Sequence, residues 1–224
     1  EIDALIATAT KNNDNQPTYY QTSTTAPGDR KFLDLNGDGR ITDDDRTIIG
    51  SPIPKVYGGV NYDASYKNFD LSVFFYYSVG NDIMNYARRN LESLATNGGV
   101  GVQNVGEEWY LNRWTPANHS NTYARAVRED VNGNGRPSDY FVEDGSYLRL
   151  RSLMLGYTLP SDIAKRLHVG KVRVYVSGQN LFTITGYSGL DPEIGEQSGA
   201  TASGIDLGTY PSTRNYTIGL NVQF

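Results

Sequence analysis

Apolar and polar side chains alternate along five unusually long stretches of the chain. Two of them, residues 56–66 and 69–79, are separated only by Lys67 and Asn68, a spacing typical of a two-residue hairpin turn. Three more stretches follow, at residues 147–159, 171–185 and 214–224. Because side chains along a strand point alternately to opposite faces, each stretch predicts a β-strand with one apolar and one polar face.

The apolar faces of two of these predicted strands are continuous. In the second stretch the face consists of Phe69, Leu71, Val73, Phe75, Tyr77 and Val79. In the last stretch it consists of Tyr216, Ile218, Leu220, Val222 and Phe224. In the stretch 147–159 the apolar phase slips between Leu150 and Leu153, which predicts a β-bulge.

The connections between the predicted strands alternate between short and long. The Lys67–Asn68 turn and the segment 161–170 are compact, whereas the segments 80–139 and 186–213 are long. Strands of about ten residues exceed the usual five or six, and short turns at one end with long loops at the other are typical of an outer-membrane β-barrel. A soluble β-sandwich also has alternating strands and is the alternative.

Two further segments carry weaker signals. Residues 1–27 are polar, and we expect an irregular lead-in with a short strand near Tyr19 and Tyr20. Within the long segment, apolar residues at helical spacing favour a helix from Ile83 to Ala95.

Composition narrows the class of protein. The 224 residues have a formal net charge of −5 and no basic patch, which argues against a nucleic-acid partner. The absence of cysteine excludes structural disulfides and cysteine-ligated zinc. No apolar run reaches the ~18 residues of a membrane helix. The first residues lack the features of a signal peptide, and the start at Glu1 suggests a piece of something longer.

The stretch DLNGDGRITDDD, residues 34–45, matches the calcium-loop pattern D-x-[DN]-x-[DN]-G. Gly39 takes the position at which the chain must turn sharply, and Thr42 is placed to act through water. An aspartate replaces the usual glutamate at the last position, which leaves Ca²⁺ and Mg²⁺ both open. The predicted ligands are Asp34, Asn36, Asp38, the backbone carbonyl of Arg40, and Asp45.

Other candidate chemistry is weaker. The run DVNGNGRPSD, residues 130–139, repeats the start of the pattern but places Phe141 at the closing position, so an Asn/Gly turn is favoured. Glu107 with Glu108, or Asp191 with Glu193, are acid pairs of the kind a glycosidase uses, but nothing fixes their separation. The candidates for a substrate or partner loop are Trp109, Tyr110 and Trp114, which fit a small loop core equally well.

The histidines, His119 and His168, stand alone in the sequence and do not suggest zinc. No nucleophile-elbow, P-loop or dinucleotide motif is present. We therefore expect no enzyme activity.

Several segments together resemble the C-terminal part of the SusC/RagA family of TonB-dependent outer-membrane transporters. They are DLNGDGRITDDDRTIIGSPIPKVYGGVNY, EEWYLNRWTPAN, SDYFVEDGSYLRLRSLMLGYTLP, VYVSGQNLFTITGYSGLDPEIG and NYTIGLNVQF. The resemblance runs over residues 28–224, in the order of the family. It implies an all-β fold: the C-terminal antiparallel strands of a 22-stranded plugged barrel with long extracellular loops.

The resemblance also implies partners and a location. The barrel lies in the outer membrane of a Gram-negative cell, with the plug and the TonB-contacting segment upstream and absent here. A SusD-like surface lipoprotein captures glycans or peptides as cargo, and no covalent catalysis is expected. The strands listed above cannot close such a barrel, so the chain must pair with the rest of it, because a bilayer does not tolerate open sheet edges.

Phe224 ends an alternating strand and resembles the C-terminal signal read by the outer-membrane assembly machinery. With Phe224 periplasmic, strand counting places the segment 161–170 in the periplasm and the segments 80–139 and 186–213 outside, together with the acidic loop. The main rival is a soluble calcium-stabilised β-sandwich that binds carbohydrate, and a hydrolase fragment is a third reading.

Overall fold

The computed structural model of the protein describes residues 19–94, 104–194 and 203–224. The chain divides into two compact units. The loop unit combines Glu1–Ile49 with Asn85–Phe141, and the strand unit combines Gly50–Met84 with Val142–Phe224. Each unit thus combines segments that are distant from one another in the sequence.

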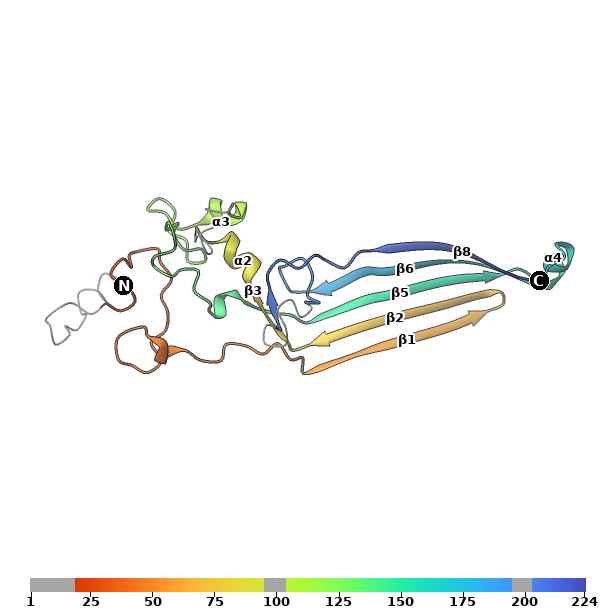
Figure 1. Ribbon diagram of the computed structural model, residues 1–224, viewed down its shortest axis with the longest axis horizontal. Coiled ribbons are helices and arrows are strands. Elements are labelled where there is room, and N and C mark those ends of the chain that lie inside the picture. Colours follow the sequence, from red (N-terminus) through yellow and green to blue (C-terminus); the bar gives the residue numbers. More distant parts are fainter. Residues whose placement is uncertain (1–18, 95–103, 195–202) are drawn as a thin grey trace. The chain divides into compact units, whose positions relative to one another are not determined.

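The strand unit is built on one antiparallel sheet in the order β1-β2-β5-β6-β8 (Figure 1). Its strands are β1 (Val56–Tyr66), β2 (Phe69–Val79), β5 (Tyr147–Thr158), β6 (Lys171–Thr185) and β8 (Asn215–Gln223). The five strands expected from alternation are thus confirmed, each to within one residue at both ends, because alternation over about ten residues leaves little room for another register.

The bulge expected in β5 is also present. In the pairing with β2, the consecutive residues Phe74 and Phe75 face Ser152 and Leu150, so Arg151 is an extra residue of β5. The register against β6 also shifts at this point, between Leu150 and Ser152. Without the shift, Leu153 and Leu155 would point to the polar face, because they have the same parity as Arg149. The bulge therefore keeps the apolar side chains before and after it on the same face of the sheet.

The connections within the strand unit are partly structured. The turn between β1 and β2 is the expected hairpin, in which Lys67 adopts a positive φ of 54°. The connection between β5 and β6 contains a short helix, α4 (Ser161–Arg166). A second sheet has the order β4-β3-β7, formed by β4 (Val142–Asp144), β3 (Asp82–Asn85) and β7 (Ile205–Asp206).

The described part of the loop unit contains short elements. They are the 3₁₀ helices η1 (Asp43–Asp45) and η2 (Asp139–Phe141) and the helices α2 (Tyr86–Leu91) and α3 (Glu107–Asn112). Tyr19 and Tyr20 belong to no strand, so that expectation is wrong.

The helix expected from Ile83 is also wrong at its start. Residues 82–85 form β3, where Ile83 pairs with Glu143 and is almost completely buried. The helix begins only at Tyr86, where the Asn85 side chain accepts a hydrogen bond of 2.8 Å from the N–H of Arg88. Pairing with a segment sixty residues away overrides the helical spacing, and Ala95 lies outside the described residues.

Candidate functional site: the sheet faces and their loops

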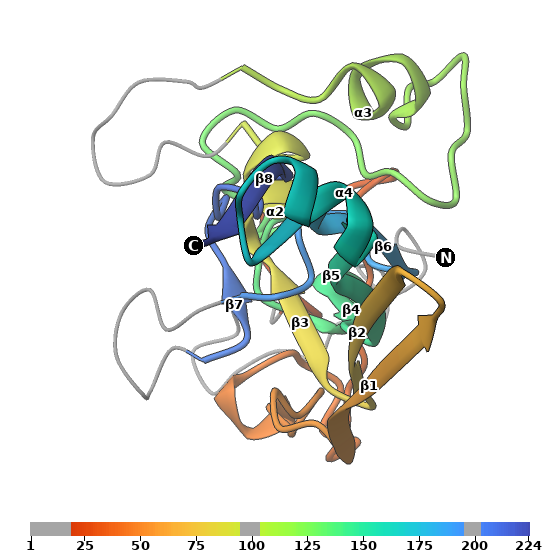
Figure 2. The same cartoon turned by 90° about the vertical axis from the view of Figure 1, so that its right-hand side faces the viewer.

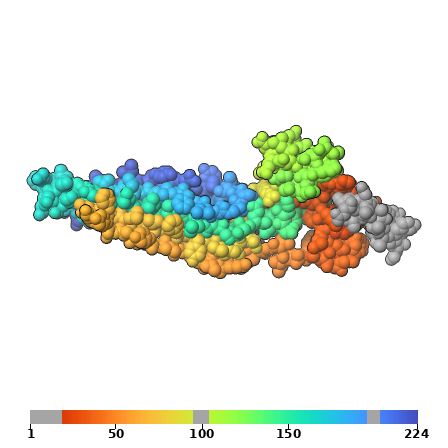
Figure 3. Space-filling view, turned by 180° about the vertical axis from the view of Figure 1, so that it is seen from behind, coloured from red at the N-terminus to blue at the C-terminus, as the bar shows by residue number. Residues whose placement is uncertain are grey.

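One face of the main sheet is apolar on every strand. The register pairs Val60 with Phe75, Leu155 with Val176, and Val176 with Ile218, so apolar side chains of neighbouring strands stand side by side. These side chains are exposed rather than covered, among them Val60, Tyr62, Leu155, Val174, Val176, Ile218 and Leu220. Figure 3 shows these strands packed side by side, coloured by their position in the sequence. Apolar area this large marks a surface that meets lipid or another protein.

The opposite face is polar and internally bonded. Arg173 on β6 reaches across Gly156 on β5 to Asp70 on β2, with its Nε 2.9 Å from the carboxylate. A Cβ on Gly156 would lie 2.5 Å from both the guanidinium and the carboxylate, so the absence of a side chain at Gly156 leaves room for this ion pair. The ion pair therefore ties three strands together on one face.

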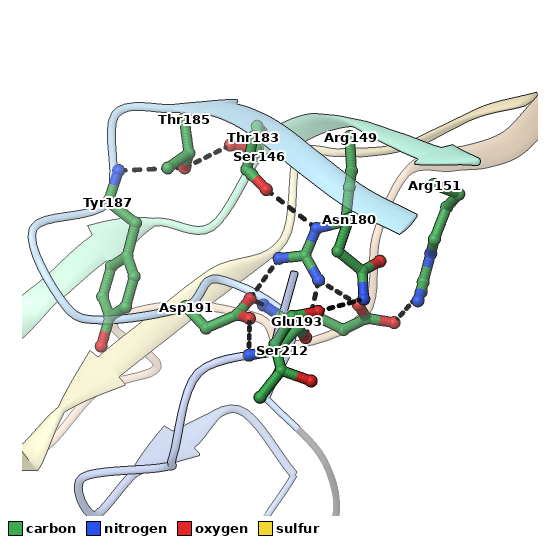
Figure 4. Close-up of polar contacts among 11 residues, drawn as sticks. Ser146, Arg149, Arg151, Asn180, Thr183, Thr185, Tyr187, Asp191, Glu193 and Ser212 are labelled. Carbon is green, nitrogen blue, oxygen red and sulfur yellow. Dashed lines mark hydrogen bonds and ion pairs between the residues drawn. The ribbon is translucent and has the colours of Figure 1, made fainter. Parts of the chain in front are cut away.

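At the other end of β5, Arg149 forms the centre of a polar network (Figure 4). Its side chain is only 2% exposed and pairs with Asp191. The same guanidinium donates to Glu193 at 2.8 Å, to Ser212 Oγ at 2.9 Å and to Thr183 Oγ1 at 2.9 Å. Arg151, the bulged residue, holds the second oxygen of Glu193. The network fastens the described parts of the 186–213 loop to the polar face.

The surroundings of Asp191 favour the ionised form of its carboxyl group. Burial by itself raises the pKa of Asp191, but hydrogen bonds from the N–H groups of Ser212 and Glu193 and from Arg149 outweigh it. The pKa of Asp191 therefore lies below its usual value, and the carboxylate stays ionised against Arg149. Asp191 and Glu193 thus serve as partners of arginines.

The acidic loop 34–45 folds around its own side chains. The N–H groups of Gly37 and Gly39 donate to the two oxygens of Asp34, at 2.7 and 2.8 Å. Both glycines have positive φ, 78° and 81°, so the sharp turn expected at Gly39 is present. Asn36 accepts from the N–H of Asp38, and Asp38 accepts from the N–H of Arg40.

Asp45 closes the loop from the other end. Its carboxylate accepts from the N–H of Thr42 at 2.7 Å and from the N–H of Leu35 at 2.9 Å. These two hydrogen bonds, that from Thr42 first, hold the pKa of Asp45 below its usual value. Among the described residues, no three His, Cys, Asp or Glu side chains converge closely enough to hold a metal ion. The donor set itself, carboxylate and amide oxygens, suits a hard cation.

The loop unit also contains a cavity of about 700 Å³ beside the acidic loop. Its walls include Phe32, Ile41, Asp45 and Arg136. Arg136 lies over the ring of Phe32, 4.7 Å from its centroid.

The three aromatic candidates have different surroundings. Trp109 is 3% exposed, so it packs the core of the loop unit. Trp114 stacks on His119 with ring centroids 5.6 Å apart and lies against Gly28. Tyr110 is 55% exposed and alone among the three presents most of its ring to the surface. Loop packing therefore accounts for the two tryptophans.

The run 130–139 is the turn that its sequence favours. Asn134 donates to Asp29 at 2.8 Å, and Arg125 donates to the same carboxylate at 2.8 and 3.0 Å. Burial opposes ionisation of Asp29, but these donors outweigh it and hold its pKa below the usual value. The asparagines thus secure a buried carboxylate. Of the other acid pair, Glu108 accepts from Tyr123 at 2.8 Å.

Sequence reasoning did not single out Arg149 or Arg173. The signal that could have found them is a cation inside an otherwise regular strand, because a buried charge needs a partner. Phe224 follows the last residue of β8 and is 96% exposed. No helix among the described residues is long and apolar enough to cross a membrane.

Comparison with known proteins identifies the family. No family model matches the sequence. TonB-dependent receptor P3 of Formosa agariphila is 42% identical over 204 residues, which cover 88% of this chain and 19% of that protein. TonB-dependent receptor SusC of Bacteroides thetaiotaomicron is 33% identical over 200 residues, which cover 88% of this chain and 18% of that protein.

The solved structure of the RagAB peptide transporter superimposes with a TM-score of 0.67 at 29% identity, over 83% of this chain and 19% of that one. The chain thus spans about a fifth of the length of the curated relatives it matches. The exposed apolar face also contradicts a β-sandwich, in which that face would be buried against a second sheet. The chain belongs to the SusC/RagA family of TonB-dependent receptors, and its long strands are barrel strands of that fold.

Proposed function

We propose that the chain forms part of the wall of an outer-membrane transporter of a Gram-negative cell. The observation that carries the proposal is the two-faced sheet, whose apolar side chains are exposed on one face while charged pairs occupy the other. Its strands have 9 to 15 residues, and about 9 to 11 tilted residues cross a bilayer. The polar face then lines the lumen, where hydrated groups are stable.

Uptake in this proposal is energised through TonB, which acts on the part of the protein upstream of this chain. A SusD-like surface lipoprotein delivers the cargo, which is a glycan oligomer or a peptide. Two relatives support parts of this proposal: SusC is a TonB-dependent receptor, which supports coupling to TonB, and RagAB is a peptide transporter, which supports the peptide class of cargo. The chain itself supplies wall strands and outer loops and performs no covalent chemistry.

The transport proposal is tested in cells that express the full-length receptor and its neighbouring lipoprotein. Labelled oligosaccharides and labelled peptides are offered separately, with and without a functional TonB. We expect uptake of one class, lost when TonB or the receptor is deleted. Equal uptake of both classes in the absence of TonB would refute the proposal.

We also propose that the acidic loop 34–45 binds Ca²⁺ or Mg²⁺ through Asp34, Asn36, Asp38, the Arg40 carbonyl and Asp45. The support is the donor set and the turn at Gly39, which already brings the N–H of Gly39 to Asp34. A carboxylate or amide oxygen has two lone pairs. Oxygens of Asp34, Asn36 and Asp38 accept one backbone hydrogen bond each, so a second lone pair is left to bind the metal. The bound metal would stabilise the fold of this loop.

The metal proposal is tested by replacing Asp34 and Asp38 together with alanine in the full-length protein. Elemental analysis after dialysis against calcium should show one fewer bound ion per molecule. The matched control is Asp43→Ala with Asp44→Ala, which removes the same charge from the same loop outside the ligand set. Unchanged metal content in the Asp34/Asp38 variant would show that the loop is an ordinary acidic turn.

A further inference from the structure

The connection between β5 and β6 has an apolar and a basic surface. In α4, Ile163 is 45% exposed and Leu167, just after the helix, is 57% exposed. Residues four apart lie on the same side of a helical turn, so the two side chains form one small apolar patch. Ala164 faces the other way and is buried, and α4 contacts β6. Figure 2 shows α4 at the near end of the sheet.

The charge of this connection is opposite to that of the chain as a whole. Lys165, Arg166 and Lys171 stand against the single acid Asp162 between residues 159 and 171, whereas the chain carries −5. Lys165 and Arg166 are exposed and form no ion pair with any residue that the structure describes. Both cations are therefore available to an anionic partner.

The connection also adjoins the apolar face of the sheet. Val172 lies on that face, paired with Val222, but is 8% exposed while Val174 on the same face is 39% exposed. The N–H of Leu159, where the connection begins, donates to the carbonyl of Val172 at 2.8 Å, and α4 contacts β6, so the connection lies next to this end of the face. Aromatic side chains mark the same end of the face: Tyr66, Phe69 and Tyr157.

We propose that this connection is an interfacial anchor that binds the headgroups of anionic phospholipids in the periplasmic leaflet. The inference rests on the proposed membrane location, which makes the short-turn end of the sheet periplasmic. Ile163 and Leu167 enter the boundary between headgroups and acyl chains, and Lys165 and Arg166 pair with lipid phosphates. An aromatic belt beside a basic cluster is the surface that such an interface selects.

The test uses the full-length receptor purified in mild detergent. Native mass spectrometry measures the binding of added phosphatidylglycerol and phosphatidylcholine to the unmodified protein and to Lys165→Gln with Arg166→Gln. The matched control, Arg46→Gln with Arg128→Gln, removes two exposed cations of the loop unit. A third variant, Ile163→Asn with Leu167→Asn, removes the apolar patch.

We expect the unmodified protein to prefer phosphatidylglycerol and the Lys165/Arg166 variant to lose that preference. At roughly 5-fold in affinity per basic residue, the loss is about 25-fold at low salt. The control should keep the preference, and the apolar variant should bind both lipids more weakly.

Equal binding of the two lipids by the unmodified protein would overturn the proposal. So would an equal loss of the phosphatidylglycerol preference in the control variant. A phosphatidylglycerol preference in a receptor without TonB-dependent uptake would support the anchor and remove only the transport proposal.

Discussion

At the scale of single residues, the protein relies on buried charges whose partners come from distant segments. Arg149 meets Asp191 and Glu193, which follow it by more than forty residues. A buried arginine is tolerated only when it is paired and hydrogen-bonded, and here four side chains share that task. The contact of Asp191, Glu193 and Ser212 with the polar face therefore depends on one guanidinium.

Replacing Arg149 with methionine should destabilise the receptor by about 3–5 kcal/mol, because it leaves a buried carboxylate without its cation. Thermal unfolding of the full-length protein in detergent measures the effect. Asp191→Asn alone should also destabilise, but the double variant should cost much less than the sum, since the two side chains act as one pair. Additive effects of the two substitutions would contradict the pairing described above.

The sequence predicted only some of these residue-level features. The oxygen-rich pattern of residues 34–45 and the turn at Gly39 are local, so they are visible in the sequence. The partners of Arg149 and of Asp29 are not, because they depend on which loops meet after the strands have paired. Two arginines spaced by one residue in an apolar strand were the available signal.

At the scale of elements, strand alternation predicted all the long strands and even the bulge in β5. It failed at β3, where helical spacing misled because the pairing partner, β4, lies far along the chain.

Within the sheet, a glycine can make room for an aromatic ring of the neighbouring strand. Tyr175 on β6 covers Gly219 on β8, and a Cβ on that glycine would overlap the ring.

Gly219→Ala should therefore cost about 1–3 kcal/mol, because the tyrosine ring must leave its place on the polar face. The matched control is Gly186→Ala, since a Cβ on Gly186 meets no atom within 4 Å. Denaturation midpoints of the two variants, measured in the same detergent, compare them directly. A double variant with Tyr175→Ala should recover most of the stability lost in Gly219→Ala. Equal midpoints for Gly186→Ala and Gly219→Ala would show that the ring does not constrain β8.

At the scale of the whole molecule, the sheet is a segment that needs neighbours. Among the described residues, β1 and β8 are the edge strands of the order β1-β2-β5-β6-β8, so each has a neighbouring strand on one side. A bilayer leaves unpaired edge groups no water to bond, so in the proposed membrane location we expect both edges to pair with other strands of the full-length receptor. The comparisons agree, since the relatives are about five times as long as this chain.

The central claim is that the face containing Val176 meets lipid and the face containing Ser177 does not. The most direct measurement is the fraction of full-length receptor that folds into outer membranes, read by heat-modifiable electrophoretic mobility, for Val176→Arg and for Ser177→Arg. An arginine on the lipid face near mid-membrane costs about 2–4 kcal/mol, so Val176→Arg should strongly reduce the folded fraction while Ser177→Arg leaves it nearly unchanged. Equal folded fractions, or a larger loss in Ser177→Arg, would contradict the account.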